Sequence, residues 1–137
     1  MATVGKRAWD VYRVVVALIA LACVAQIYLA GRGVFGLEGD AALGDQSSFD
    51  PHRLLGNVIG IAAIVVFVLA LVLWDLQLVV WTLVLAVLAE AVQHVTTDAA
   101  SPWVAGLHAL SGLGVFVVSA WLAHRAWRHR GTAEPAA

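Results

Sequence analysis

The chain has 137 residues, of which 62% are hydrophobic and only 12% charged, and its formal net charge is −1 at pH 7. So few polar residues cannot cover a water-soluble globule of this size, and the composition therefore predicts a protein surrounded mostly by the lipid bilayer. A near-neutral charge provides no basic field to attract nucleic acid, which excludes nucleic acid as a partner. The single cysteine, Cys23, lies in an apolar run, which excludes a disulfide framework and a thiolate metal cluster.

The first two apolar segments are each long enough to cross a bilayer core of about 30 Å. The first helix is expected at about residues 9–30, and its length and the lack of a small-residue cleavage site indicate a retained helix rather than a signal peptide. A polar loop at 31–50 follows. Asp50-Pro51 then starts a second helix at about 51–74, because a capping residue before a proline is typical of a helix N-terminus.

The last two apolar segments complete an antiparallel arrangement. Asp75, Leu76 and Gln77 form a tight turn into the third helix, and Ser101-Pro102 repeats the cap-plus-proline start for the fourth. The expected ranges are about 78–95 for the third helix, about 102–123 for the fourth and 124–137 for a short tail. The sequence therefore predicts an all-α membrane protein, a single up-down bundle of four transmembrane helices.

Basic residues are distributed unevenly around these helices. Arg32 and Arg53 lie beside the loop between the first two helices, whereas the others flank the two ends of the bundle sequence. These others, six of the eight Lys and Arg residues, are Lys6, Arg7, Arg13, Arg125, Arg128 and Arg130. The positive-inside rule then puts both termini in the cytoplasm, and we interpret the basic tail as a topology anchor.

Polar side chains at membrane depth are costly and therefore mark candidate functional residues. All of them belong to the half of the bundle predicted to lie toward the outer face, whereas the inner half is expected to be apolar and only to span the membrane. They are Gln26, Glu90, Gln93, His94 and His108, with His52 and Arg53 at the entrance of the second helix. This clustering predicts a site near the outer face.

Two helices carry the pattern His-x-x-x-Gly, at His52 with Gly56 and at His108 with Gly112. A residue four places further on lies on the same helix face, so each histidine has a backbone patch without a side chain beside it. A haem needs an imidazole that reaches the iron and a flat surface for the macrocycle. The second and fourth helices are parallel and diagonal in an up-down bundle, so the sequence predicts b-type haem ligated by His52 and His108. Alternatively, the glycines serve only close helix packing.

Other ligand sets remain open. His52 lies roughly 34 Å of helix before Asp75 and His108 roughly 24 Å before His124, so the two need not be level. His94 with His108 is the alternative haem pair, in which Glu90, one turn from His94, serves as a proton acceptor or as a partner of the ligand. A zinc site is also open. It would use His52, His94, His108 and Glu90, although no metal-binding spacing preorganises them.

The stretch from Asp50 to Gly56 resembles the His-Arg motif of the haem A synthases, at the start of a second helix. A longer stretch, from Gln93 through Pro102-Trp103 to Leu107-His108, resembles that family's approach to its fourth helix. The resemblance implies one four-helix half of such a protein, with axial His52 and His108, and Arg53 paired with a haem propionate. Phe49 stands where the family has an acidic residue, and the family's loop cysteine pair is missing, so oxidative chemistry does not follow and no catalytic residue is assigned.

The architecture is also similar to small four-helix membrane proteins of high-GC bacteria, which implies a bacterial inner membrane. We therefore expect a membrane b-type haem protein, with its haem near the outer face, that serves electron transfer or haem handling and meets a membrane redox partner or a second copy of itself. A haem enzyme is the second expectation. The alternative of a different class is a small subunit or scaffold without haem that binds a partner membrane protein.

Overall fold

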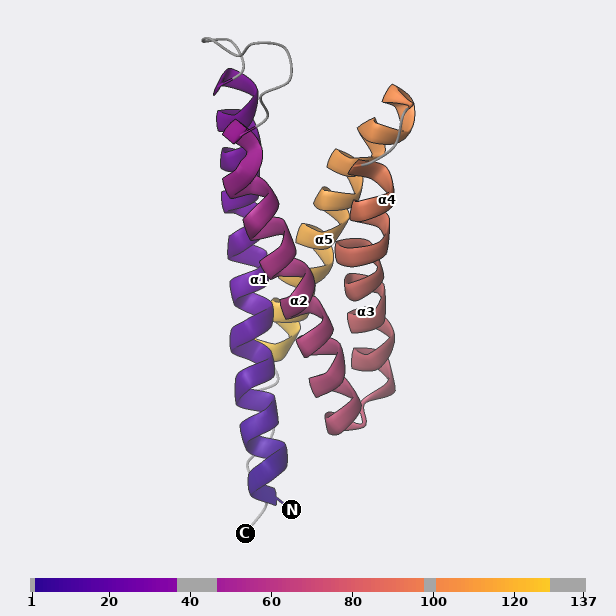
Figure 1. Cartoon of the computed structure of the whole chain (residues 1–137). Coiled ribbons are helices and arrows are strands. Elements are labelled where there is room, and N and C mark those ends of the chain that lie inside the picture. Colours follow the sequence, from indigo (N-terminus) through magenta and orange to yellow (C-terminus); the bar gives the residue numbers. More distant parts are fainter. Residues whose placement is uncertain (1, 37–46, 98–100, 129–137) are drawn as a thin grey trace.

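The computed structural model describes residues 2–36, 47–97 and 101–128 of the chain. Within these ranges nearly every residue is helical, which confirms the predicted all-α class (Figure 1). The elements are α1 (Ala2–Gly36), a short 3-10 helix η1 (Ser47–Phe49), α2 (Asp50–Leu73), α3 (Leu76–Ala86), a π-helix η2 (Val87–Val92), α4 (Gln93–Thr97) and α5 (Pro102–Arg128).

Four segments are long and apolar enough to cross a membrane, so the chain is a multi-pass membrane protein. They are Val4–Phe35, Ser47–Leu73, Leu76–Thr97 and Gly106–Arg128, and the third of them joins α3, η2 and α4 into one helix. The helices alternate in direction, so α1 begins where α5 ends (Figure 1). We call this end, which includes the turn between α2 and α3, the terminal end. The opposite end, where α1 and α4 finish and α2 and α5 begin, is the histidine end.

The helices extend beyond several of the expected boundaries. α1 covers Ala2–Gly36 rather than 9–30, and α5 continues to Arg128, so the first residues of the predicted tail at 124–128 are helical. The remaining tail, 129–137, lies outside the described residues, as does 37–46 of the predicted loop. Hydropathy marks the part of a helix that lies in lipid, whereas backbone hydrogen bonds continue into the flanking polar turns.

The predicted tight turn between the second and third helices is confirmed. Trp74 adopts a left-handed conformation with φ of 54°, and its backbone N–H donates to the carbonyl of Leu71. The Asp75 carboxylate then accepts hydrogen bonds from the backbone N–H groups of Gln77 at 2.9 Å and Leu78 at 3.1 Å. Asp75 is therefore the N-cap of α3, which accordingly begins at Leu76 rather than at residue 78.

Neighbouring helices in the bundle follow the order α1, α2, α3 and α5. Among the described residues α1 packs against α2 and α5, and α3 packs against the same two helices, whereas α2 and α5 make no backbone approach to each other. The expectation that these two helices are diagonal is therefore confirmed. The core between the four comprises Tyr12, Val16, Ile19, Cys23, Ile59, Ala63, Val66, Ala70, Leu78, Leu85, Ala89, Val115, Leu122 and Ala126.

Charged and aromatic side chains join the helices at the terminal end. The Arg13 guanidinium binds the Asp10 carboxylate at 2.8 Å and lies 5.1 Å above the ring of Trp127, which connects α1 to α5. Arg125 lies 3.7 Å from the carboxylate of Asp75, which connects α5 to the α2–α3 turn. The side chains of Arg13 and Arg125 are only 11% and 19% exposed, so both are part of the packing.

A contact between two tilted indole rings adds to the packing of the same region. The rings of Trp81 and Trp121 lie 5.1 Å apart, and the Arg125 guanidinium lies 5.7 Å from the Trp121 ring. The terminal half was expected to be apolar and to do no more than span the membrane, and this expectation is wrong. Its arginines sit between helices because their flat guanidinium groups can pair with a carboxylate and stack on an indole at the same time.

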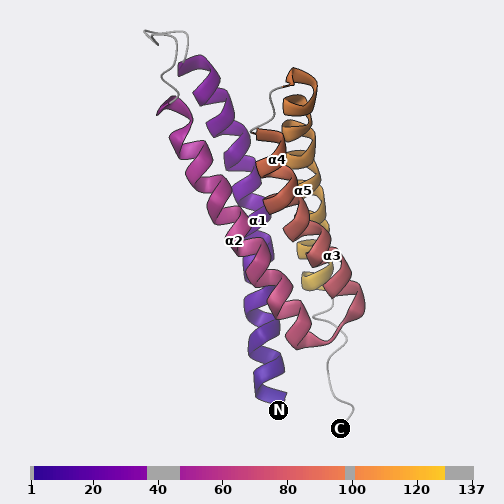
Figure 2. The ribbon, with the colours of Figure 1, turned by 45° about the vertical axis from the view of Figure 1, so that its right-hand side comes forward.

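The two helical pairs separate toward the histidine end. α4 packs only against α5 and η2 among the described elements, and not against α1 or α2. Both views show the α1–α2 pair leaning away from the α4–α5 pair at this end (Figures 1 and 2). The polar residues of the predicted site therefore lie where the bundle is most loosely closed.

Candidate functional site

His52 and His108 come together at the histidine end although their helices are diagonal. Their ring centroids are 6.1 Å apart and the ring planes make an angle of 62°. The length difference along the two helices is absorbed because α5 extends to Arg128 while α2 ends at Leu73. The two histidines of the repeated motif are therefore level.

A neighbouring helix holds each histidine ring through its Nδ1 atom. His52 Nδ1 lies 3.3 Å from the backbone carbonyl oxygen of Gln26, an atom that can only accept, so His52 donates from Nδ1. His108 Nδ1 lies 2.9 Å from the hydroxyl of Thr97, which itself donates to the carbonyl of Gln93 at 2.8 Å. The hydroxyl proton is thereby used, so Thr97 accepts from His108. Both rings then have the same tautomer, in which Nε2 carries the free lone pair.

This arrangement fits a metal between the two rings. An imidazole nitrogen binds a transition metal at about 2 Å, so two rings on opposite sides of one metal have their centres roughly 6 Å apart. The observed 6.1 Å agrees with that separation, and two axial imidazoles can adopt any angle about the line through the metal. Tying Nδ1–H to an oxygen is also how proteins orient a ligating histidine and increase its basicity.

The glycines of the two motifs lie under glutamine side chains. A Cβ on Gly56 would lie 3.1 Å from the Gln26 amide nitrogen, and a Cβ on Gly112 would lie 3.4 Å from that of Gln93. Gln93 also donates to the Ser111 hydroxyl at 2.9 Å and to the His108 carbonyl at 3.3 Å. The prediction of patches without a covering side chain is therefore wrong in this structure: the glycines admit a glutamine from the adjacent helix.

Gln26 retains unused hydrogen-bonding capacity. Its side-chain oxygen Oε1 is buried and has no hydrogen-bond partner among the described residues, beside the His52 ring that its own backbone carbonyl holds. A buried amide oxygen without a partner is unfavourable by about 1–3 kcal/mol, so a hydrogen-bond donor that reached this atom would stabilise the site.

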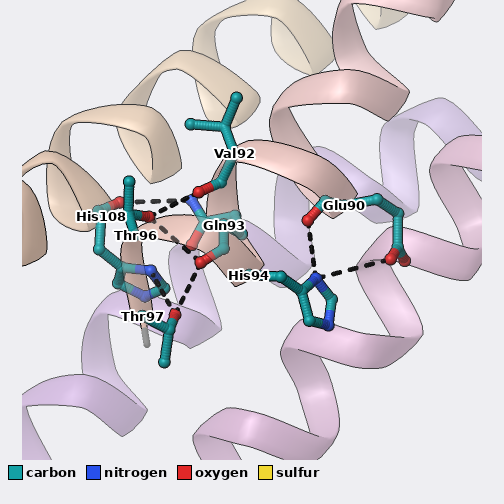
Figure 3. A network of polar contacts seen from close by, with 7 residues as sticks. All are labelled: Glu90, Val92, Gln93, His94, Thr96, Thr97 and His108. Carbon is teal, nitrogen blue, oxygen red and sulfur yellow. Dashed lines mark hydrogen bonds and ion pairs between the residues drawn. The ribbon is translucent and has the colours of Figure 1, made fainter. Parts of the chain in front are cut away.

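His94 and Glu90 form a separate pair. The His94 ring donates from Nδ1 to the Glu90 backbone carbonyl at 2.7 Å and lies 3.7 Å from the Glu90 carboxylate. Gln93 and Thr97 turn toward His108, whereas His94 turns toward Glu90 (Figure 3). The geometry therefore holds His108 beside His52 rather than pairing it with His94.

A zinc site is not formed. Among the described residues, no three His, Cys, Asp or Glu side chains lie close enough together to hold a metal ion. The predicted group of His52, His94, His108 and Glu90 is therefore wrong as a cluster, because the His94 ring pairs with Glu90 and not with the two other histidines. Arg53 remains at the start of α2, where it pairs with Asp50 at 3.3 Å and is half exposed.

The π-helix η2 was not predicted from the sequence. It covers Val87–Val92 and carries Glu90, whose carboxyl group lies against Gly60 of α2, where any Cβ would collide with it. Single π-turns inside α-helices are rare and are frequent at functional sites. The available signal was the pairing of a mid-helix glutamate with a mid-helix glycine on adjacent antiparallel helices.

Comparisons of the chain with protein-family models, with curated proteins and with solved structures give no match. The resemblance to haem A synthases therefore stays a prediction that stands on the motifs around His52 and His108. What the geometry adds is independent of that resemblance. It consists of two level imidazoles with matching tautomers, held from diagonal helices.

Proposed function

We propose that this membrane protein binds one b-type haem at the histidine end, with His52 and His108 as the axial ligands, and uses it in electron transfer or haem handling. The observation that carries the proposal is the ring pair, whose centroids are 6.1 Å apart while both Nδ1 atoms are engaged elsewhere. A haem iron supplies one-electron redox chemistry when it is bound.

The chain's own residues would orient the ligands. The Gln26 carbonyl and the Thr97 hydroxyl engage Nδ1 of the two rings, which would leave Nε2 of each ring to hold the haem iron. The Gln26 and Gln93 amides lie on the glycines beside each ring and would border the macrocycle. Arg53, at the boundary of the span, offers a cation to a propionate.

In this proposal the protein lies in a bacterial inner membrane with both termini in the cytoplasm, so the histidine end faces outward. The support is the position of the basic residues, since six of the eight lie near the terminal end in the sequence. An outward haem would be placed to exchange electrons with a membrane redox partner or a second copy of the chain, rather than with a cytoplasmic protein.

The test is the absorption spectrum of the full chain, produced with a haem supply and purified in detergent. We expect a Soret band that is lost in His52→Ala and in His108→Ala and kept in His94→Ala. His124→Ala, at the terminal end, is the matched control and should keep the band. A wild-type protein that stays colourless and carries no metal would overturn the proposal and favour a small subunit that binds a partner membrane protein.

A further inference from the structure

Glu90 carries a carboxyl group at membrane depth. It lies seven residues before Thr97, the last residue of α4, which places its Cα about 10 Å of helix below the histidine end. Its carboxyl group contacts Gly60, and its side chain is 33% exposed. An ionised carboxylate is unfavourable in hydrocarbon, so Glu90 needs either a proton or a cationic partner there.

The elements packed against η2 offer Glu90 one titratable neighbour. Beyond Arg53, α2 has no ionisable side chain, and α3 has none along its length. On α5 the titratable group nearest to the histidine end is His108, whose ring is bonded to Thr97. His52 lies in contact with His108 rather than with Glu90. His94, on Glu90's own helix, is therefore the partner of this carboxylate.

The His94 side chain is more exposed than the Glu90 side chain. Its side chain is 61% exposed and lies three residues from the end of α4, at the boundary of the span. Nδ1 donates to the Glu90 backbone carbonyl at 2.7 Å and lies 3.7 Å from the carboxylate. The ring therefore connects two environments: the boundary at its exposed side and the Glu90 carboxylate beside Nδ1.

We infer that Glu90 and His94 form a proton-relay pair, a protonatable site distinct from the His52–His108 rings. A proton from water at the boundary binds Nε2 of His94. The Nδ1–H bond then breaks as its proton passes to the Glu90 carboxylate, which leaves a neutral imidazole and a neutral carboxyl group. The 3.7 Å gap closes by rotation of the Glu90 side chain, and release follows the same steps in reverse.

The transfer requires little free energy because the net charge of the pair does not change. Once the pair holds one extra proton it has no net charge, whether that proton lies on the imidazole or on the carboxyl group, so movement between the two leaves the total charge at membrane depth unchanged. Gly60 leaves space for the Glu90 carboxyl group, since a Cβ at this position would overlap with it. The π-helix supplies the turn on which Glu90 faces α2 while Gln93 faces α5.

The experiment is infrared difference spectroscopy of the full chain in lipid nanodiscs at a series of pH values, observing the carbonyl stretch of protonated carboxyl groups. We expect a component that titrates in the wild type and is lost in Glu90→Gln. Asp50→Asn, which removes an exposed carboxylate at the same end, should keep that component. A component that persists in Glu90→Gln, or no titrating component at all, would overturn the proposal.

A second variant tests the partner without removing the carboxylate. His94→Gln should displace the titration of the Glu90 component by about one pH unit or more, because the carboxylate loses its cationic partner. His124→Gln, an exposed histidine at the other end, should leave it in place. An unchanged titration in His94→Gln would show that Glu90 exchanges protons without His94 and would overturn the relay. None of these readouts requires haem.

Discussion

The two ends of the bundle are held together in different ways. At the terminal end, contacts cross between the helical pairs, from Arg13 on α1 to Trp127 on α5 and from Arg125 on α5 to Asp75 at the α2–α3 turn. At the histidine end, most polar contacts stay within one pair. The difference suggests that the terminal end fixes the fold, while the histidine end leaves the two pairs free to close on something between them.

Each helical pair at the histidine end places a glutamine amide against the glycine that follows a histidine. In the first pair Gln26, late in α1, lies on Gly56 of α2, and its backbone carbonyl holds the His52 ring. In the second pair Gln93, in α4, lies on Gly112 of α5, and Thr97 holds the His108 ring. Two similar half-sites that face each other suit a ligand with two equivalent faces, such as a flat macrocycle.

Among the substitutions that test the difference between the two ends, Gly60→Leu is expected to lower the stability most. Gly60 is the point at which the Glu90 carboxyl group reaches across from η2 to α2, so a leucine there must displace the Glu90 side chain from this buried contact. We expect a loss of about 3 kcal/mol in the free energy of unfolding, measured by circular dichroism during denaturation in mixed micelles. Gly31→Leu is the control, because nothing lies within 4 Å of its Cβ position, and equal losses in the two variants would contradict the close contact.

The terminal end should respond next most strongly, to Arg13→Ala. This change removes a guanidinium that is 11% exposed and leaves Asp10 and the Trp127 ring without it. We expect a loss of about 2 kcal/mol by the same unfolding assay, from lost packing as well as lost charge. Arg7 is exposed and lies more than one turn before Arg13 on the same helix. Arg7→Ala should therefore lower the free energy of unfolding by less than about 0.5 kcal/mol. A similar stability in both variants would mean that the terminal end is not held by this contact.

At the histidine end, Thr97→Val tests the hydrogen bond that holds the His108 ring. The substitution keeps the side-chain shape but removes the hydroxyl that accepts from His108 Nδ1. If the haem proposal holds, its affinity should fall about tenfold in a haem titration followed at the Soret band, because the ring loses its fixed tautomer. The control is Thr96→Val, whose hydroxyl bonds only to carbonyls of its own helix, at Val92 and Gln93. Equal haem affinities in Thr97→Val and Thr96→Val would show that the Thr97 hydroxyl does not support His108 in haem binding.

Sequence reasoning predicted the four helices and their order because lipid imposes a strong length and composition rule on each span. It also predicted that His52 and His108 lie on diagonal helices at one end. It missed the role of Arg13 and Arg125, because a basic residue beside a span has the same sequence pattern whether it faces water or packs on an indole. It also missed η2, because a π-turn depends on contacts between helices, here Glu90 with Gly60.

The smallest expected effect, from Ser111→Ala, concerns the bond that joins α4 to α5. Ser111 accepts from the Gln93 amide at 2.9 Å, whereas the Thr82 hydroxyl on α3 donates to carbonyls of its own helix, at Leu78 and Val79. Hydrogen bonds between membrane helices are worth about 0.6 kcal/mol on average, so Ser111→Ala should lose roughly that much stability and the control Thr82→Val less. A double-mutant cycle with Gln93→Leu measures the coupling directly. A coupling near zero would mean that the second half-site is shaped by the glycine contact alone.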